Sequence, residues 1–324
     1  TVNTTSAGCG RIELGANAKD TWGGLGFSST GSPKLTVSGQ VVIGGYGSTS
    51  TNRQGIVTLV NGATLEAEDI VLTRSTAGSD NPGTLSMATG GTLIANTITL
   101  GQGTATWTPG TGTVILTSTN NLTLPSATFT SFNNLTINAN KTVFSGVSFS
   151  VAGTMTVNGT FTPGATTHVI SGAGTLTGSG EIDVTLVSAT ALTSQFSITN
   201  RTLSNMTVEY RGAGNQSMLG TTYGHLTTAG SGTKTLLGTT TVNGNLAIGV
   251  STTLNGGGQS LNVGGNWSNS GTFTHASGTV TFNGNAAQAI TGNTNFNNFI
   301  VTNSASNISL ASSYAMGVEG TFTP

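Results

Sequence analysis

An internal repeat constrains this 324-residue chain more than any other feature. GIVTLVNGATLEAEDIVL at 55–72 aligns without a gap on GTLSMATGGTLIANTITL at 83–100, which defines a 28-residue repeat. In each copy, apolar residues come in pairs two positions apart, such as Leu65 and Ala67. Alternate side chains of a strand share one face, so each copy predicts three short strands with an apolar inner face. One copy cannot bury that face alone, so stacking of successive copies must supply the core.

A second repeat is much longer. SFNNLTINA at 131–139 returns as NFNNFIVTN at 295–303, which indicates that a unit of several coils has been duplicated. The pattern predicts an all-β fold, a parallel β-helix (β-solenoid) of roughly a dozen coils of about 24 residues each. The alternative is a pair of tandem β-sandwich domains. Sandwiches explain the alternation, but not the gapless repeat or the glycines at the expected corners, Gly62 and Gly90.

Three regions follow from these patterns. Residues 1–33 hold a dense charge cluster for this chain, including Arg11 and Glu13, and are predicted to be an N-terminal cap or assembly segment. Residues 34–111 carry the 28-residue repeats, and residues 112–324 carry the longer duplicated unit. Pro324 matches Pro163, after which the first copy continues as further coil. We therefore expect the chain to end in mid-repeat with unpaired strand edges, either trimmed there or pairing head to tail with another copy.

Composition excludes several classes of protein. Charged residues are 6% of the chain and the net charge is −1, so there is no electrostatic footprint for nucleic acid or an anionic membrane. No apolar run is long enough for a transmembrane helix. The sequence begins at Thr1 without a signal-peptide pattern, which predicts a processed or trimmed product. The lone Cys9 is expected to be a small buried side chain, the alternative being an intermolecular disulfide.

The motif G-G-T-L-x-A-x-x-I-x-L-G, carried by Gly90 to Gly101, resembles the autotransporter-associated β-strand repeat. The segments GTVTFNGNAAQAITG and LNVGGNWSNSGTF, at 278–292 and 261–273, resemble secreted bacterial surface proteins of the filamentous-haemagglutinin and adhesin type. The resemblance covers most of residues 34–324. It implies a right-handed parallel β-helix, export from the cell, and an adhesive or structural role. It implies no catalytic residue.

Parallel β-helices that act on polysaccharides need clustered carboxylates, often with Ca²⁺. Glu66 and Glu68 are predicted to point outward, with Asp69 at the next corner and Asp80 in the following loop. These four are weak candidates for a metal or sugar site, and a solvated acidic face is the alternative. Glu181 and Asp183 also share a face, with the same alternatives. The three histidines, which lack metal-ligand spacing, are expected at the surface or at corners: His168, His225 and His275.

Threonine triplets such as TFT at 272–274 recur, but their spacing is too irregular to predict the one-triplet-per-coil array of an ice-binding face. Sequons for N-glycosylation are about as frequent as chance predicts. They lie at Asn3, Asn121, Asn134, Asn140, Asn158, Asn200, Asn205, Asn215, Asn266 and Asn307. Asparagines 133, 134, 297 and 298 follow a phenylalanine in both long copies and are expected at corners, with their amides bonded between coils. The phenylalanines expected to point inward are Phe132, Phe144, Phe161, Phe273, Phe282, Phe296 and Phe299.

The sequence therefore predicts an extracellular or cell-surface structural protein, without cofactor or enzymatic activity. Its expected partner is itself, as a homopolymer assembled head to tail through solenoid edges into a fibre. The alternative is a monomeric adhesin or stalk segment that binds a glycan or matrix, with 66–80 as its patch. A carbohydrate-active β-helix enzyme or an ice-binding protein is less favoured. No nucleic acid partner and no membrane insertion of this segment are expected.

Overall fold

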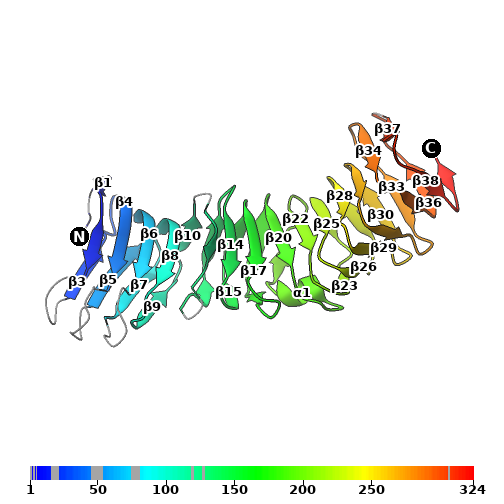
Figure 1. The fold of residues 1–324 in the computed structure, drawn as a ribbon. Helices are drawn as coiled ribbons and strands as arrows, with labels where there is room; N and C mark the ends of the chain where they lie inside the picture. Colours follow the sequence, from blue (N-terminus) through cyan, green and yellow to red (C-terminus); the bar gives the residue numbers. More distant parts are fainter. Residues whose placement is uncertain are drawn as a thin grey trace. The chain divides into compact units, whose positions relative to one another are not determined.

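The computed structural model describes residues 2, 4, 6–15, 22–44, 54–73, 81–117, 120–125, 128–305 and 307–324. These residues form strands β1 to β39 and the five-residue helix α1 (Ala191–Gln195). The chain divides into two compact units. Unit 1 comprises Thr1–Gly159 and Ile170–Thr175, and unit 2 comprises Thr160–Val169 and Leu176–Pro324. In each unit the strands stack one behind another (Figure 1).

Unit 1 contains one long ladder and three shorter ones. The long ladder runs through β1 (Ala7–Cys9), β4 (Lys34–Ile43), β6 (Thr64–Leu72), β8 (Thr92–Leu100), β10 (Thr113–Leu116), β13 (Asn134–Ile137) and β16 (Thr154–Val157), and β2 (Ile12–Leu14) also pairs with β4. The second runs through β3 (Trp22–Gly26), β5 (Gln54–Val60), β7 (Gly83–Thr89) and β9 (Ala105–Thr108). The others are β12 (Ser131–Phe132), β15 (Phe149–Val151) and β18 (Ile170–Ser171), and the pair β11 (Leu122–Thr123) and β14 (Thr142–Ser145).

Unit 2 is built in the same way. Its longest ladder runs through β17 (Thr160–Pro163), β20 (Glu181–Val184), β22 (Thr207–Tyr210), β25 (His225–Thr228), β28 (Leu246–Ile248), β31 (Trp267–Asn269), β34 (Gln288–Thr291) and β37 (Ile308–Leu310). A second runs through β23 (Gln216–Met218), β26 (Gly232–Leu236), β29 (Thr252–Asn255) and β32 (Thr272–Thr274). A third runs through β24 (Thr222–Tyr223), β27 (Thr240–Val242), β30 (Ser260–Val263), β33 (Thr279–Phe282), β36 (Asn298–Val301) and β39 (Phe322–Thr323). The remaining pairs are β35 (Thr294–Phe296) with β38 (Met316–Val318), and β19 (Thr175–Gly178) with β21 (Asn200–Arg201).

The ladders are parallel, and each strand pairs with one in the next stretch of chain, here called the next coil. Thr64 pairs with Thr92, which confirms the register that the 28-residue repeat predicts. Coil length varies along the chain, since the stretch from Lys34 to its partner Thr64 is much longer than the stretch from Thr207 to its partner His225. This is the pairing of a parallel β-solenoid, and it excludes tandem antiparallel sandwiches for the described ladders.

Alternation places the apolar residues inside, as the sequence predicts. Leu65, Leu93 and Val114 lie in register and are 0%, 0% and 1% exposed. The prediction for Phe144 is wrong, because Val143 and Ser145 take the inward positions of β14 and Phe144 is half-buried on the other face. Phe273 is also only half-buried, whereas the other five predicted phenylalanines are buried: Phe132, Phe161, Phe282, Phe296 and Phe299.

Corners use glycine and asparagine. Gly62 and Gly90 adopt φ of 82° and 113°, a region that disfavours a side chain. Asn134 confirms the predicted bonding between coils, because its Nδ2 donates to Thr113 Oγ1 at 3.2 Å and its Oδ1 accepts from Thr154 N at 2.8 Å. Asn298, the matching residue of the second long copy, repeats both bonds with Thr279 and Thr321 at 3.3 and 3.1 Å. The long repeat in the sequence therefore corresponds to the same pair of side-chain hydrogen bonds between coils, made once in each copy.

The first region also forms parallel ladder strands. β1 and β2 pair with β4, and β3 pairs with β5. Arg11 and Glu13 of its charge cluster form an ion pair at 3.0 Å, while Lys19 and Asp20 lie outside the described residues. The expectation of a buried Cys9 is wrong, because Cys9 lies on edge strand β1 and is exposed. Among the described residues, no helix has the length and apolar character to cross a membrane.

Candidate functional site

The acidic patch predicted near residue 66 is a set of separate contacts on unit 1. Glu66 forms an ion pair with Lys34 at 2.6 Å, and Asp69 accepts from Thr97 Oγ1 at 2.5 Å. Glu68 is exposed, and Asp80 lies outside the described residues. A shallow hollow of about 260 Å³ lies over β4, β6 and β8. Its lining includes Thr36, Ser38, Glu66, Glu68, Asn96 and Thr117.

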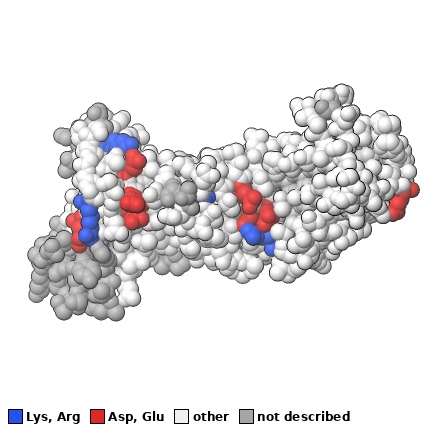
Figure 2. Space-filling view, turned by 45° about the horizontal axis from the view of Figure 1, so that its top comes forward, with Lys and Arg blue, Asp and Glu red and all other residues white. Residues whose placement is uncertain are grey.

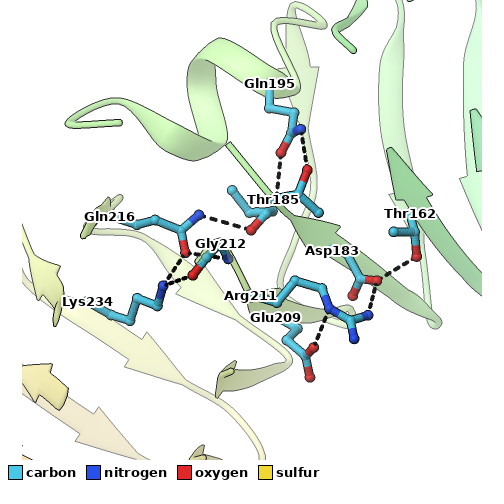
Figure 3. Close-up of polar contacts among 10 residues, drawn as sticks. Thr162, Asp183, Thr185, Gln195, Glu209, Arg211, Gly212, Gln216 and Lys234 are labelled. Atoms are coloured by element: carbon cyan, nitrogen blue, oxygen red, sulfur yellow. Dashed lines mark hydrogen bonds and ion pairs between the residues drawn. The ribbon is translucent and has the colours of Figure 1, made fainter. Parts of the chain in front are cut away.

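The second predicted pair, Glu181 and Asp183 on β20, belongs to a larger cluster. Asp183 pairs with Glu209 in the register between β20 and β22, and Arg211 follows the end of β22. Arg211 Nη1 donates to Asp183 Oδ2 at 2.6 Å, and its Nε lies 3.2 Å from Glu209 Oε1 (Figure 3). Thr162 Oγ1 of β17 donates to the same Asp183 Oδ2 at 2.5 Å.

Burial distinguishes these acids from a solvated face. Although Asp183 occupies an outward position of its strand, its side chain is 0% exposed, because Thr162 and the partly exposed Arg211 cover it. Its Oδ1 atom is buried and has no hydrogen-bond partner. The alternative reading from sequence, a solvated acidic pair, is therefore wrong for Asp183. Figure 2 shows the acidic and basic side chains gathered into a few small patches, some of mixed sign and some acidic only, on an otherwise uncharged face.

The cluster shifts the protonation of its glutamates. Burial, followed by the negative charges of Asp183 and Glu209, raises the pKa of Glu181 to about 7 against the opposing effect of Arg211. Burial and the charge of Asp183 also raise the pKa of Glu209, again opposed by Arg211. Three carboxyl groups thus surround one guanidinium, and with a pKa of about 7 Glu181 can take a proton near neutral pH.

Beside the cluster, buried amides bind backbone groups where the coil length changes. The coil from Glu181 to its partner Thr207 is longer than the following coil, from Thr207 to His225, and it includes helix α1. Gln195, at the end of that helix, accepts from Thr185 N and Leu186 N through Oε1 at 2.7 and 3.0 Å. Its Nε2 donates to Thr185 Oγ1 at 2.8 Å (Figure 3). These bonds fix the helix to the end of β20.

Gln216 and Lys234 continue this network. Gln216 Nε2 donates to Val184 O at 2.9 Å and Leu186 O at 2.8 Å, and its Oε1 accepts from Gly212 N. Lys234 is 0% exposed, and its Nζ donates to Gln216 Oε1 at 2.7 Å (Figure 3). Nζ also donates to three carbonyl oxygens, those of Gly212, Gly214 and Ser231, at 2.7, 2.9 and 3.0 Å. Burial lowers the pKa of Lys234 to about 8.

The same arrangement recurs further along unit 2. Gln288 donates through Nε2 to Val263 O and Gly265 O, and it accepts from Gly284 N, four residues before it, as Gln216 does from Gly212. Asn303 takes the place of Lys234 and donates to Gln288 Oε1 at 2.9 Å. In unit 1, the buried Lys141 donates to Asn96 O at 2.7 Å and Asn120 O at 2.6 Å, and burial lowers its pKa. These polar side chains hold neighbouring coils together from inside.

The histidines serve local contacts. His225 Nδ1 accepts from Asn245 N at 2.9 Å, and His275 lies 3.2 Å from Glu319. Across the described ranges, no group of three or more His, Cys, Asp or Glu side chains has an arrangement that could hold a metal ion.

The sequons differ in exposure. Asn134 and Asn158 are half-buried, and Asn3 is not described. The exposed ones are Asn121, Asn140, Asn200, Asn205, Asn215, Asn266 and Asn307.

One column of outward threonines lies in register over three strands of unit 2. Thr233 pairs with Thr253, which pairs with Thr272. In the second outward column, Asn255 interrupts the threonines between Thr235 and Thr274. This array is shorter and less uniform than the one-triplet-per-coil face that ice binding requires.

Sequence reasoning found Glu181 and Asp183 but missed Glu209, Arg211 and Lys234. One signal was available: the charged segment VEYR at 208–211 follows EIDV at 181–184 by one coil. The arrangement binds backbone groups through Gln195, Gln216 and Lys234, and it can bind a proton at Glu181. A scan against protein-family models finds no match to this chain, and searches of curated proteins and of solved structures find none either.

Proposed function

We propose that this chain is a structural module of an extracellular or cell-surface fibre. In this proposal it is a right-handed parallel β-helix of about a dozen coils that joins other copies head to tail. The parallel ladders and the buried polar contacts between coils support a load-bearing role, because each coil is tied to the next through backbone and side chain. The fully buried Asp183 argues against a glycan-cleaving site at the acidic cluster, since a catalytic carboxyl must reach its substrate.

One observation carries the proposal: in the last described coil of unit 2, large apolar side chains are exposed beside strands that each pair with one neighbour among the described residues. β37, β38 and β39 are the final strands of their ladders. Leu310, Tyr314 and Phe322 on this coil are 41%, 41% and 55% exposed. The Phe322 ring stacks on Phe299, with centroids 5.8 Å apart and planes at 11°. An aromatic column and strand edges that can accept a further strand therefore lie together in this coil, and such edges pair readily with strands of a partner.

The occupant that we propose is a second copy. In unit 1, β1 and β3 are edge strands of parallel ladders. Because a parallel ladder can be extended at either edge by a strand of the same direction, these strands can pair with β37 and β39 of another copy. The contact needs no charged partner, which fits a chain with 6% charged residues.

Electron microscopy of the native protein tests this proposal. We expect fibres whose axial repeat is close to the length of one folded subunit, and we expect Phe322→Asp to abolish these fibres. Leu237→Asp is the matched control, because Leu237 is 58% exposed but does not lie on the edge coil. Single short rods from the native protein, or fibres that persist in F322D, would contradict head-to-tail assembly.

A second candidate is a monomeric adhesin that binds a glycan. The hollow beside Glu66 favours it, since hydroxyl, amide and carboxylate groups line it as they line sugar sites. Glycan binding that is lost in Glu68→Gln and Asn96→Ala, by a protein that forms no fibres, would favour this function instead.

A further inference from the structure

The buried oxygen of Asp183 that lacks a partner requires an explanation. Oδ2 of this carboxylate accepts from both Thr162 and Arg211, whereas Oδ1 is buried and unbonded. A buried acceptor without a donor is destabilising, and more so when it is charged. Glu181 lies two residues earlier on the same face of β20, so its carboxyl group is the nearest group on that strand that can supply a proton.

We propose that Glu181 donates a hydrogen bond to Asp183 Oδ1 when it is protonated, so that this carboxyl pair shares a proton and makes the stability of unit 2 depend on pH. The proposal is independent of the fibre role. It concerns the contact between β20 and β22, because ionised Glu181 and Asp183 on β20 both repel Glu209 on β22 and compete for Arg211, and a proton on Glu181 removes one of these charges.

The charged groups around Glu181 and Asp183 favour the binding of a proton by this carboxyl pair. β22 contributes Glu209 and the adjoining Arg211, and β17 contributes the uncharged Thr162. Glu181 pairs with Thr207 of β22, which pairs in turn with His225 of β25, so His225 is separated from Glu181 by one strand. The Nδ1 atom of His225 accepts a hydrogen bond from Asn245 N. With all three acids ionised, one guanidinium faces three carboxylates. A proton on Glu181 removes one of these charges and supplies the missing donor.

The direction of the pH effect follows from linkage. The pKa of Glu181 is about 7 in the folded chain and has an ordinary value of 4.5. Because the folded state holds this proton more tightly, the stabilisation is complete below about pH 4.5 and is lost as the pH rises through about 7. Between pH 6 and 8, we expect the equilibrium constant for opening of this coil contact to rise about tenfold. Solvent screening at the partly exposed Glu181 makes this an upper value.

Hydrogen exchange of the full chain, followed by mass spectrometry, tests the proposal. After correction for intrinsic exchange, amides of β20 and β22 should lose about tenfold protection between pH 6 and 8. β6 and β8 of unit 1 serve as the internal reference. Glu181→Gln should remove the pH dependence, because the glutamine amide donates at every pH. Glu68→Gln, at an exposed glutamate, should retain it.

Three results would overturn the proposal. They are equal protection of β20 and β22 at both pH values, unchanged pH dependence in E181Q, and protection at pH 8 that Ca²⁺ restores, which would make the cluster a cation site. Carboxyl NMR provides a measurement that does not depend on how E181Q folds. Among the glutamates of the chain, the one assigned to residue 181 should titrate near pH 7. Titration near its ordinary value of 4.5 would exclude a shared proton.

Discussion

Replacing Lys234 by methionine tests whether buried polar contacts hold the coils of unit 2 together. Methionine keeps most of the apolar stem and removes the ammonium group, whose three N–H groups face four oxygen atoms within 3.0 Å. Hydrogen bonds to a charged group contribute about 1.5–3 kcal/mol each, but they are not additive and are offset by the desolvation of the ammonium. Removing the ammonium leaves neutral buried acceptors without this donor, and each unsatisfied acceptor costs about 1–3 kcal/mol, so we expect unit 2 to lose about 3 kcal/mol.

Urea unfolding followed by the fluorescence of Trp267 measures this loss. Trp267 is 0% exposed and lies in unit 2. The background substitutions Trp22→Phe and Trp107→Phe make Trp267 the sole tryptophan of the chain. A probe confined to one unit is needed because a chain of two units need not unfold in a single transition. The transition midpoint should fall in K234M, while Leu237→Met, at an exposed side chain of the same unit, should change the free energy of unfolding by less than about 0.5 kcal/mol.

A double mutant separates the lost contacts from lost packing. The double mutant Gln216→Met with Lys234→Met replaces both the amide and the ammonium that it faces by apolar side chains. Replacing both partners of a hydrogen bond by apolar groups can leave the free energy of unfolding nearly unchanged. The double mutant should therefore be less destabilised than the sum of the two single mutants. If K234M lowers the free energy of unfolding by less than about 1 kcal/mol, the four contacts do not carry the stability that we assign to them.

The remaining predictions concern single positions. Gly159→Ala should destabilise unit 1 by about 2 kcal/mol in urea unfolding, because a β-carbon there would overlap Lys141 O and Asn138 O, whereas Gly10→Ala, where no atom lies within 4 Å, should be neutral. Asn134→Ala and Asn298→Ala should each cost about 1 kcal/mol in their own unit, and equal stability of both variants with wild type would contradict the corner bonds. In glycopeptide mapping of native protein, sugar should be absent from Asn134, whose Nδ2 donates to Thr113, and present at exposed sequons such as Asn266. An intact mass equal to that of the bare polypeptide would show that no sugar is attached.

The ladder register was readable from the sequence because it depends on local alternation and on coil length. The 28-residue repeat set both quantities, and Thr64 pairs with Thr92 as expected. The corner asparagines were readable for the same reason, since each follows an inward phenylalanine at a fixed distance. Phe144 shows the limit of this reasoning, because a strand shifted by one residue reverses which side chains point inward.

The polar network was hidden because burial of an outward position depends on the neighbouring coil. Asp183 follows the outward alternation of β20, and it is covered only because Thr162 of β17 and Arg211, which follows β22, bind its carboxylate from the neighbouring coils. The coil from Glu181 to Thr207 is longer than the next coil, from Thr207 to His225, and both differ in length from the 28-residue repeat near the start of the chain. The repeats therefore could not predict how far along the sequence the partner of Asp183 lies. Lys234 was missed for a related reason, since an inward lysine conflicts with the apolar pattern and is tolerated only where several carbonyl groups converge.

Variation in coil length also explains why such polar contacts exist. Where adjacent coils differ in length, the strand ladders end early and leave backbone groups inside the stack without partners, which is costly in a buried setting. Gln195, Gln216 and Lys234 bind such groups around the long coil that contains α1, and Gln288 with Asn303 does so again later in the unit. Lys141 and Lys234 are both fully buried in this role. In a chain with so few charges, part of the charge therefore serves the interior, where it satisfies the backbone at irregular coils, and neutral Thr, Ser and Asn side chains cover much of the surface.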